Sequence, residues 1–161
     1  MKTSKALEEL SASISLIITD TSDIIWKQNL SGELNDYDKN KLTVFFGVSS
    51  DVMRIQRMLH DMTQEILSSK RTFDDTRHQK LSKMIEPYDI FFDKTKDTII
   101  LLHGAAHFSY CVCKRIMYEF DNDDPYDKEV HIFLDSLKNL LYLLGRVVNN
   151  FRVYGEPKYL Y

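Results

Sequence analysis

Hydrophobic residues recur along most of this chain at alternating spacings of three and four residues, the pattern of α-helices that bury one face. The first run covers residues 4–30, and Gly32 follows it in a position that can close a helix. A second run covers residues 38–68, where Gly47 and the Ser49-Ser50 pair lower helix propensity near the middle. We therefore expect two long helices, the second broken or kinked near Gly47.

The stretch from 94 to 120 is apolar on two neighbouring helical lines. The lines consist of Ile99, Leu102, Ala106, Cys113, Met117 and Phe120, and of Leu101, Ala105, Phe108, Val112 and Ile116. A helix that is apolar over so much of its circumference is normally the central member of a bundle. The sequence predicts one continuous central helix here, preceded by a weaker helical segment that Pro87 breaks or kinks.

The last helical pattern begins at Asp124 and Pro125, residue types that suit an N-cap and a first helical position. It runs to about residue 153, and residues 155–161 follow as an aromatic tail that either docks on the bundle or stays loose. Ile132 and Leu143 lie beyond the main apolar stripe. Either this helix is deeply packed, or its widened apolar face serves as an oligomer or partner surface.

These patterns predict an all-α fold, a single domain over residues 1–161 built as a bundle of four to five long, mostly antiparallel helices. The net charge of −3 disfavours broad electrostatic capture of nucleic acid. Cys111 and Cys113, two apart on a helix, point away from each other and cannot form a disulfide there. Without a disulfide framework, a signal peptide or an apolar run long enough for a bilayer, we expect a cytoplasmic protein without membrane contact.

Two histidine pairs raise the question of metal binding. His103 and His107 are four apart on one predicted helix, and His131 and Asp135 are four apart on the next. Residues at this spacing share a helical face and can hold one metal ion. The arrangement resembles the hemerythrin-like bundles, and this resemblance would imply a di-iron site. That family also has an upstream histidine with a glutamate four residues later, whereas here Glu65 follows His60 by five. The ligand set is incomplete, so we predict no metal or other cofactor.

A second pattern suggests nuclease chemistry. Arg71 and His78 have six residues between them, and Arg54 and His60 have five. This spacing is similar to the arginine–histidine motif of the HEPN ribonucleases, which are small all-α proteins. The resemblance implies RNA cleavage, with the arginine stabilising a developing phosphorane and the histidine moving a proton. A solvated basic turn accounts for the same residues without any chemistry.

The third feature is an acidic loop between the last two predicted helices. It comprises Glu119, Asp121, Asp123, Asp124, Asp127 and Glu129, opposed only by Lys128 within that stretch. Pro125 and Tyr126 rule out an EF-hand, whose loop needs a glycine at the sharp turn. Helix capping explains part of the cluster. The remaining carboxylates suit contact with a basic protein surface.

Nothing in the sequence forms a phosphate-binding glycine loop, a nucleophile elbow or a paired-cysteine zinc site, which argues against an enzyme. We therefore expect a small soluble protein–protein interaction module of the adaptor, inhibitor or immunity type. The six acidic loop residues are its predicted contact site, and another protein with a basic surface is its predicted partner. The nuclease and the metal-binding bundle remain as alternatives.

Overall fold

A computed structural model describes residues 2–32, 39–91, 98–100, 104–151 and 158–160 of the chain. Its helices are α1 (Lys2–Ser31), α2 (Lys39–Phe46), α3 (Val48–Leu67), α4 (Thr76–Phe91), α5 (Ala105–Ile116), the 3₁₀ turn η2 (Met117–Phe120) and α6 (Pro125–Asn150). Two short strands, β1 (Thr98–Ile100) and β2 (Lys158–Leu160), complete the described elements. The predicted all-α bundle of long helices is confirmed.

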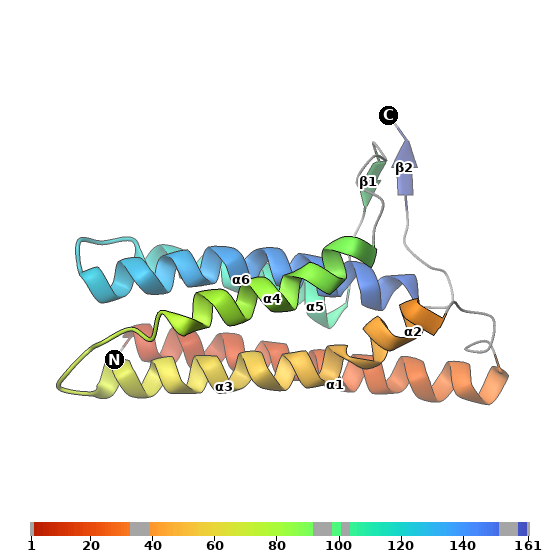
Figure 1. Cartoon of the computed structure of the whole chain (residues 1–161), viewed down its shortest axis with the longest axis horizontal. Helices are drawn as coiled ribbons and strands as arrows, with labels where there is room; N and C mark the ends of the chain where they lie inside the picture. Colours follow the sequence, from red (N-terminus) through yellow and green to blue (C-terminus); the bar gives the residue numbers. More distant parts are fainter. Residues whose placement is uncertain (1, 33–38, 92–97, 101–103, 152–157, 161) are drawn as a thin grey trace.

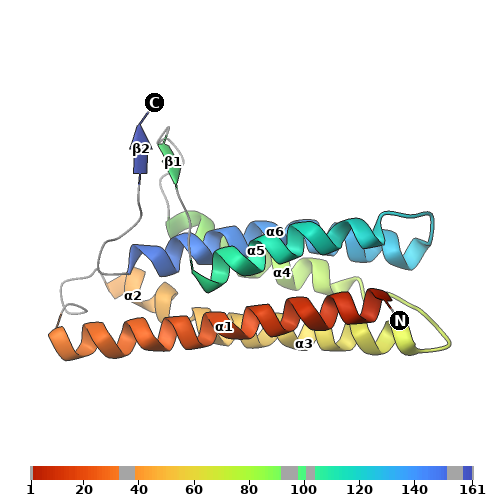
Figure 2. The ribbon, with the colours of Figure 1, turned by 180° about the vertical axis from the view of Figure 1, so that it is seen from behind.

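The bundle is assembled as two layers of helices. α1 packs along α3 and α5, while α6 packs along α5 and α4. Figure 1 shows α4 crossing obliquely between the layer of α5 and α6 and the layer of α1 and α3. Figure 2 shows the opposite side, where α1 and α5 lie next to each other. None of the described helices is both long and apolar enough to cross a membrane.

Helix α6 is the most extensively buried of the described helices, whereas the sequence assigned that character to residues 94–120. Its buried side chains follow the predicted stripe, with Phe133, Leu137 and Leu144 fully inaccessible to solvent. Asp124 adopts an extended backbone (φ −65°, ψ 124°) and caps the helix, and Pro125 holds the first helical position, as predicted. α6 ends at Asn150, close to the expected end at residue 153.

The predicted continuous helix over residues 94–120 is wrong. α5 begins at Ala105, and its last turn tightens into η2. Instead, Thr98–Ile100 forms a strand that pairs antiparallel with Lys158–Leu160, and Thr98 lies opposite Leu160. β-branched Thr98, Ile99 and Ile100 favour an extended backbone. Residues 94–97 and 101–103, and with them His103, lie outside the described residues.

Glycine explains why α5 starts where it does. Gly104 has φ 89° and ψ −171°, a conformation that residues with a Cβ rarely adopt. The helical line through Ile99 and Leu102 therefore cannot continue unbroken into α5. In contrast, the break predicted near Gly47 is confirmed, because α2 ends at Phe46 and α3 begins at Val48.

Candidate functional site

The turn between η2 and α6 is fixed by hydrogen bonds within its own sequence. The Asp124 side chain accepts from the backbone N–H of Tyr126 at 2.8 Å and of Asp127 at 3.4 Å. Asn122 Oδ1 accepts from the backbone N–H of Asp124 at 2.9 Å, and Asn122 Nδ2 donates to Asp127 Oδ2 at 2.7 Å. These bonds satisfy the first backbone donors of α6 and hold the turn in one conformation.

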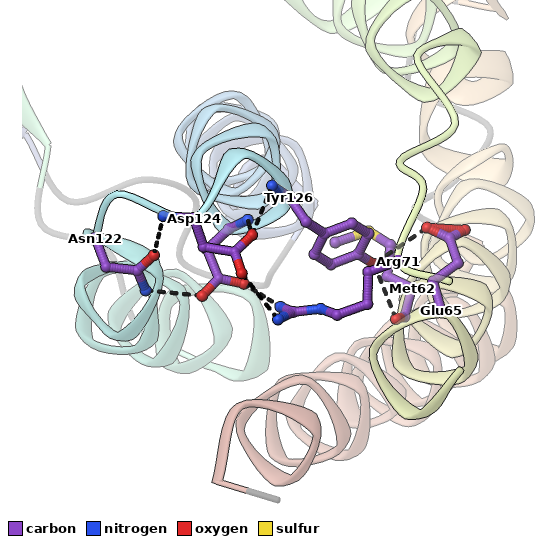
Figure 3. A network of polar contacts seen from close by, with 7 residues as sticks. Met62, Glu65, Arg71, Asn122, Asp124 and Tyr126 are labelled. Carbon is purple, nitrogen blue, oxygen red and sulfur yellow. Dashed lines mark hydrogen bonds and ion pairs between the residues drawn. The ribbon is translucent and has the colours of Figure 1, made fainter. Parts of the chain in front are cut away.

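The same turn is joined to the α3–α4 connector by Arg71. Its guanidinium donates to Asp124 Oδ2 at 3.1 Å and to Asp127 Oδ1, and it lies 4.9 Å from the centre of the Tyr126 ring. Figure 3 shows Arg71 reaching from the connector to these carboxylates, with the Tyr126 ring beside it. Two acidic residues thus share one basic partner that lies more than fifty positions away in the sequence.

A second set of bonds extends this network into α3 and α4. The Tyr126 hydroxyl lies 3.1 Å from both the Met62 carbonyl oxygen and Glu65 Oε1. Arg77, which is 4% exposed, pairs with both oxygens of Glu65. Burial lowers the pKa of Arg77, but its bonds to Glu65 outweigh this and raise it above its ordinary value. Burial, and then the charge of Glu65, raise the pKa of Tyr126. The loop-end network is the name we give to this set of residues, which comprises Met62, Glu65, Arg71, Arg77, Asn122, Asp124, Tyr126 and Asp127.

His78 lies at the edge of the loop-end network. Its Nε2 is 3.1 Å from Glu129 Oε2, and its ring stacks on Phe73 with centroids 5.2 Å apart. Asp75, His78 and Glu129 each offer a ligand atom, and these atoms lie within 4.8 Å of one another. Sequence spacing could not reveal this set, because Glu129 lies on α6. An exposed aspartate beside a histidine–glutamate pair is also an ordinary surface arrangement, so the cluster alone assigns no metal.

The six acidic residues of the predicted contact site have different surroundings. Asp124 and Asp127 belong to the loop-end network, and Glu129 faces His78. Asp121 and Asp123 are exposed, and their side chains form no hydrogen bond or ion pair with any described residue. Of the predicted set, Asp121 and Asp123 are therefore the two residues whose carboxylates are exposed and unpaired among the described residues.

A shallow cavity of about 360 Å³ lies beside Asp121 and Asp123. Its lining also includes Lys128, His131 and Ile132. Sequence reasoning missed this cavity, because it forms where the turn folds over the first turns of α6.

Glu119, the sixth acidic residue of the predicted contact site, is half-buried in η2.

Exposed apolar side chains adjoin this cavity. Ile132 is 53% exposed, so the apolar surplus noted on the last helix is not fully packed inside the bundle. Tyr118 is 69% exposed and sets its ring edge-on to His131, with centroids 6.2 Å apart. An aromatic and an aliphatic side chain thus stand in solvent next to two free carboxylates. We call Tyr118, Asp121, Asp123 and Ile132 the turn face.

The residues of the nuclease pattern lie against other side chains. Arg71 is engaged by Asp124 and Asp127, and His78 by Glu129. In the second match, Arg54 pairs with Asp51 one turn away on α3, and His60 is exposed. Each arginine of the two motifs is thus paired with a carboxylate, and of the two histidines only His78 faces one among the described residues.

The histidine pairs are not gathered into one site within the described part of the chain. His107 stacks on Tyr110 with ring centroids 5.9 Å apart. His131 Nδ1 is 2.7 Å from the Met117 carbonyl oxygen, and Asp135 pairs with Lys138 at 3.0 Å. The described residues include no grouping of His107, His131 and Asp135 that could hold a metal ion.

Comparison with known proteins adds no relative to this picture. No protein-family profile matches the chain, and a search of curated proteins found no match. Functional inference therefore rests on the geometry of the described residues.

Proposed function

We propose that this protein works by binding another protein through the turn face. The observation that carries the proposal is the exposure of Tyr118 and Ile132 next to the carboxylates of Asp121 and Asp123. Protein interfaces commonly combine an apolar centre, enriched in tyrosine, with a polar rim. The cavity beside the turn gives an inserting side chain of the partner a place to pack.

The loop-end network supports the proposal by holding the turn still. Asp124 and Asp127 are tied to Arg71 and to the backbone of α6, so Asp121 and Asp123 project from a turn with little freedom. An interface that is ordered before binding avoids part of the entropy cost of association. In this account Asp124 and Asp127 position the contact, while Asp121 and Asp123 make it.

Charge indicates the chemistry of the partner. The two free carboxylates face solvent at the turn, and the whole chain carries a net charge of −3. Such a surface attracts a basic partner and speeds its diffusional encounter. We infer a partner that presents lysine or arginine around an exposed apolar side chain, which would enter the cavity beside Ile132.

Charge reversal at the turn tests the proposal. The double variant Asp121→Lys/Asp123→Lys should slow association with the partner by roughly tenfold at low salt, because steering by rim charges acts on the association rate. Surface plasmon resonance against partners recovered by native pull-down measures this rate. The matched control is Glu8→Lys/Asp61→Lys, which makes the same charge change at exposed positions of α1 and α3. Equal association rates for the two double variants would contradict the proposal.

Ile132→Asp tests the apolar part of the same surface. Ile132 is half exposed, so the substitution should change the free energy of unfolding by less than about 0.5 kcal/mol. It should nevertheless increase the dissociation rate of the complex, because it places a charge at the centre of the interface. Met53→Asp is the control, since Met53 is 56% exposed on α3. Unchanged dissociation in Ile132→Asp would remove the turn face as the contact.

A further inference from the structure

The seam between α3 and α4 is open. Four helix pairs supply the main packing of the bundle, α1 with α3, α1 with α5, α5 with α6 and α4 with α6. The pair α3 and α4 is not among them, although the two helices are consecutive in the chain. A cavity of about 520 Å³ lies along this seam, within the size range of pockets that bind small molecules.

Four basic side chains line this cavity, two from each helix. Arg54 and Arg57 come from α3, and Lys80 and Lys83 come from α4. In each pair the residues are three positions apart, which places them on one helical face about one turn, or roughly 5 Å, from each other. Arg57, Lys80 and Lys83 form no hydrogen bond or ion pair with a described residue. The cavity wall therefore holds cations that the fold itself does not neutralise.

Among the described residues that line the cavity, Asp51 is the acidic one, and its side chain is already engaged. Asp51 Oδ1 lies 3.3 Å from an Arg54 guanidinium nitrogen, and Asp51 Oδ2 accepts a hydrogen bond from the Tyr88 hydroxyl. Tyr88 is 2% exposed and links α4 to α3 through this bond. Four cations and one carboxylate give this wall a formal charge of about +3, although the whole chain is acidic.

The floor of the cavity is apolar. Met58 and Met84 contribute side chains that are 8% and 7% exposed, and Pro87 lines the same cavity from α4. Methionine adapts its shape to irregular apolar and aromatic groups. A ligand that fits this cavity thus has a compact anionic part and an apolar or aromatic body.

We propose that the α3–α4 seam binds a small organic diphosphate. A diphosphate on an organic body carries about three negative charges at neutral pH, which matches the charge of the wall. Arginine binds phosphate oxygens in pairs, and lysine adds point charges. The body of the ligand would lie against Met58 and Met84. The body can be a nucleoside or an isoprenoid chain, because both place apolar surface next to the two phosphates.

The geometry disfavours a nucleic acid chain in the same place. The cations span about one helical turn on each helix, which is too short for a run of several phosphates. Proteins that bind single strands also stack bases on aromatic rings, and none of the described residues that line this cavity is aromatic. A short, two-sided cluster of cations over methionine fits a single small ligand.

Isothermal titration calorimetry of the full chain tests the proposal with four probes, namely ADP, geranyl diphosphate, inorganic pyrophosphate and a ten-nucleotide RNA. At least one organic diphosphate should bind with one-to-one stoichiometry and at least tenfold more tightly than pyrophosphate. The better probe identifies the body that the floor accepts. The variant Arg57→Glu/Lys83→Glu should weaken this binding at least tenfold, since it replaces two unpaired cations.

Two further variants distinguish a loss of the binding site from an effect of net charge and from a loss of folding. Lys2→Glu/Lys5→Glu makes the same charge change at exposed positions of α1 and should leave the affinity within twofold. Arg57→Lys/Lys83→Arg keeps the charge and should retain binding. The proposal is overturned if neither organic diphosphate binds more tightly than pyrophosphate. It is also overturned if Lys2→Glu/Lys5→Glu lowers the affinity as much as Arg57→Glu/Lys83→Glu does, or if the RNA binds and the organic diphosphates do not.

Discussion

Glu65 shows how single residues hold this molecule together. Its carboxylate pairs with Arg77 and meets the Tyr126 hydroxyl, so it joins α3, α4 and α6 at one point. Arg77 is 4% exposed, and an unpaired charge at that depth would be strongly destabilising. The pairing explains why a basic residue lies inside this end of the bundle. Removing either partner should therefore cost far more than removing a surface ion pair.

Arg77→Met should lower the free energy of unfolding by about 3 kcal/mol, because it leaves Glu65 without its main partner in a partly buried position. Glu65→Gln should also destabilise, and the double variant should lose less than the sum of the two changes. Urea unfolding of the four proteins measures this coupling. Arg115→Met is the control, because its pair with Glu9 is more than half exposed and should be worth under about 1 kcal/mol. Additive changes at Arg77 and Glu65 would contradict the account.

Tyr126 gives a test that depends on pH. Burial and the nearby Glu65 raise the pKa of Tyr126 in the folded protein above its ordinary value of 10.0. A raised pKa means that the neutral phenol contributes stability below pH 10, and that this contribution is lost as the pH rises further. Tyr126→Phe should be less stable than the natural protein at pH 8, by roughly 1–2 kcal/mol for the lost hydrogen bonds. Above pH 10 the difference should shrink, whereas a constant difference would refute the assignment.

At the scale of elements, helix boundaries were predicted best where a local cap defines them. Asp124 with Pro125 marks the start of α6, and Gly47 marks the break between α2 and α3. α4 begins at Thr76, where Asp74 Oδ1 accepts from the backbone N–H and the hydroxyl of Thr76 and so caps the helix. The connector also contains Thr72 and Asp75, which are residue types that cap helices, so the choice of cap depends on where the connector turns.

The two caps should differ in their effect on stability. Asp74→Ala should cost about 1 kcal/mol, the usual value for a lost N-cap. Asp124→Ala should cost more, because it removes both the cap of α6 and a partner of Arg71. Chemical denaturation at pH 7 measures both changes. Equal losses would mean that Arg71 adds nothing to the turn.

Asp74 also makes an acid-dependent contribution. Hydrogen bonds from Thr76 lower the pKa of Asp74 below its ordinary value of 3.8. A lowered pKa means that the contribution is present above the unfolded value and is lost as the pH falls through the folded value. The difference between the natural protein and Asp74→Ala should therefore hold from pH 7 to about pH 4 and decrease below it. Thermal unfolding at stepped pH values measures this change, and a difference that persists at pH 2 would contradict the assignment.

The prediction failed where a helical and an extended pattern compete. Ile99 and Leu102 fit a helical stripe by their spacing, yet residues 98–100 pair with 158–160 as strands. The partner strand lies about sixty residues away, so no local pattern could reveal it. Gly104 carried the available signal, because an isolated glycine inside an apolar helix pattern often marks a boundary. The same long-range pairing places residues 158–160 of the tail in a sheet.

At the scale of the whole molecule, the acidic loop and the basic connector are complementary parts of one end of the bundle. Each was visible in the sequence as a separate charged block. The contacts of Arg71 with Asp124 and of His78 with Glu129 depend on the folded arrangement of α4 and α6, which brings the two blocks together. The use of the acidic loop as a contact surface stays a prediction, and the fold adds the distinction between the acidic residues that are paired and those that are exposed. The cavities beside Ile132 and between α3 and α4 depend on several elements and had no sequence signal.

Site-specific photocrosslinking tests the proposed turn face most directly. A benzophenone amino acid would replace Ile132 or, as a matched control, Met53, which is similarly exposed on another helix. Irradiation in a lysate of the source cells should link the position-132 protein to one discrete basic protein, with a yield that falls when Asp121 and Asp123 are changed to lysine. The position-53 protein should not form this product. Crosslinking of the same partner from position 53 but not from position 132 would contradict the account.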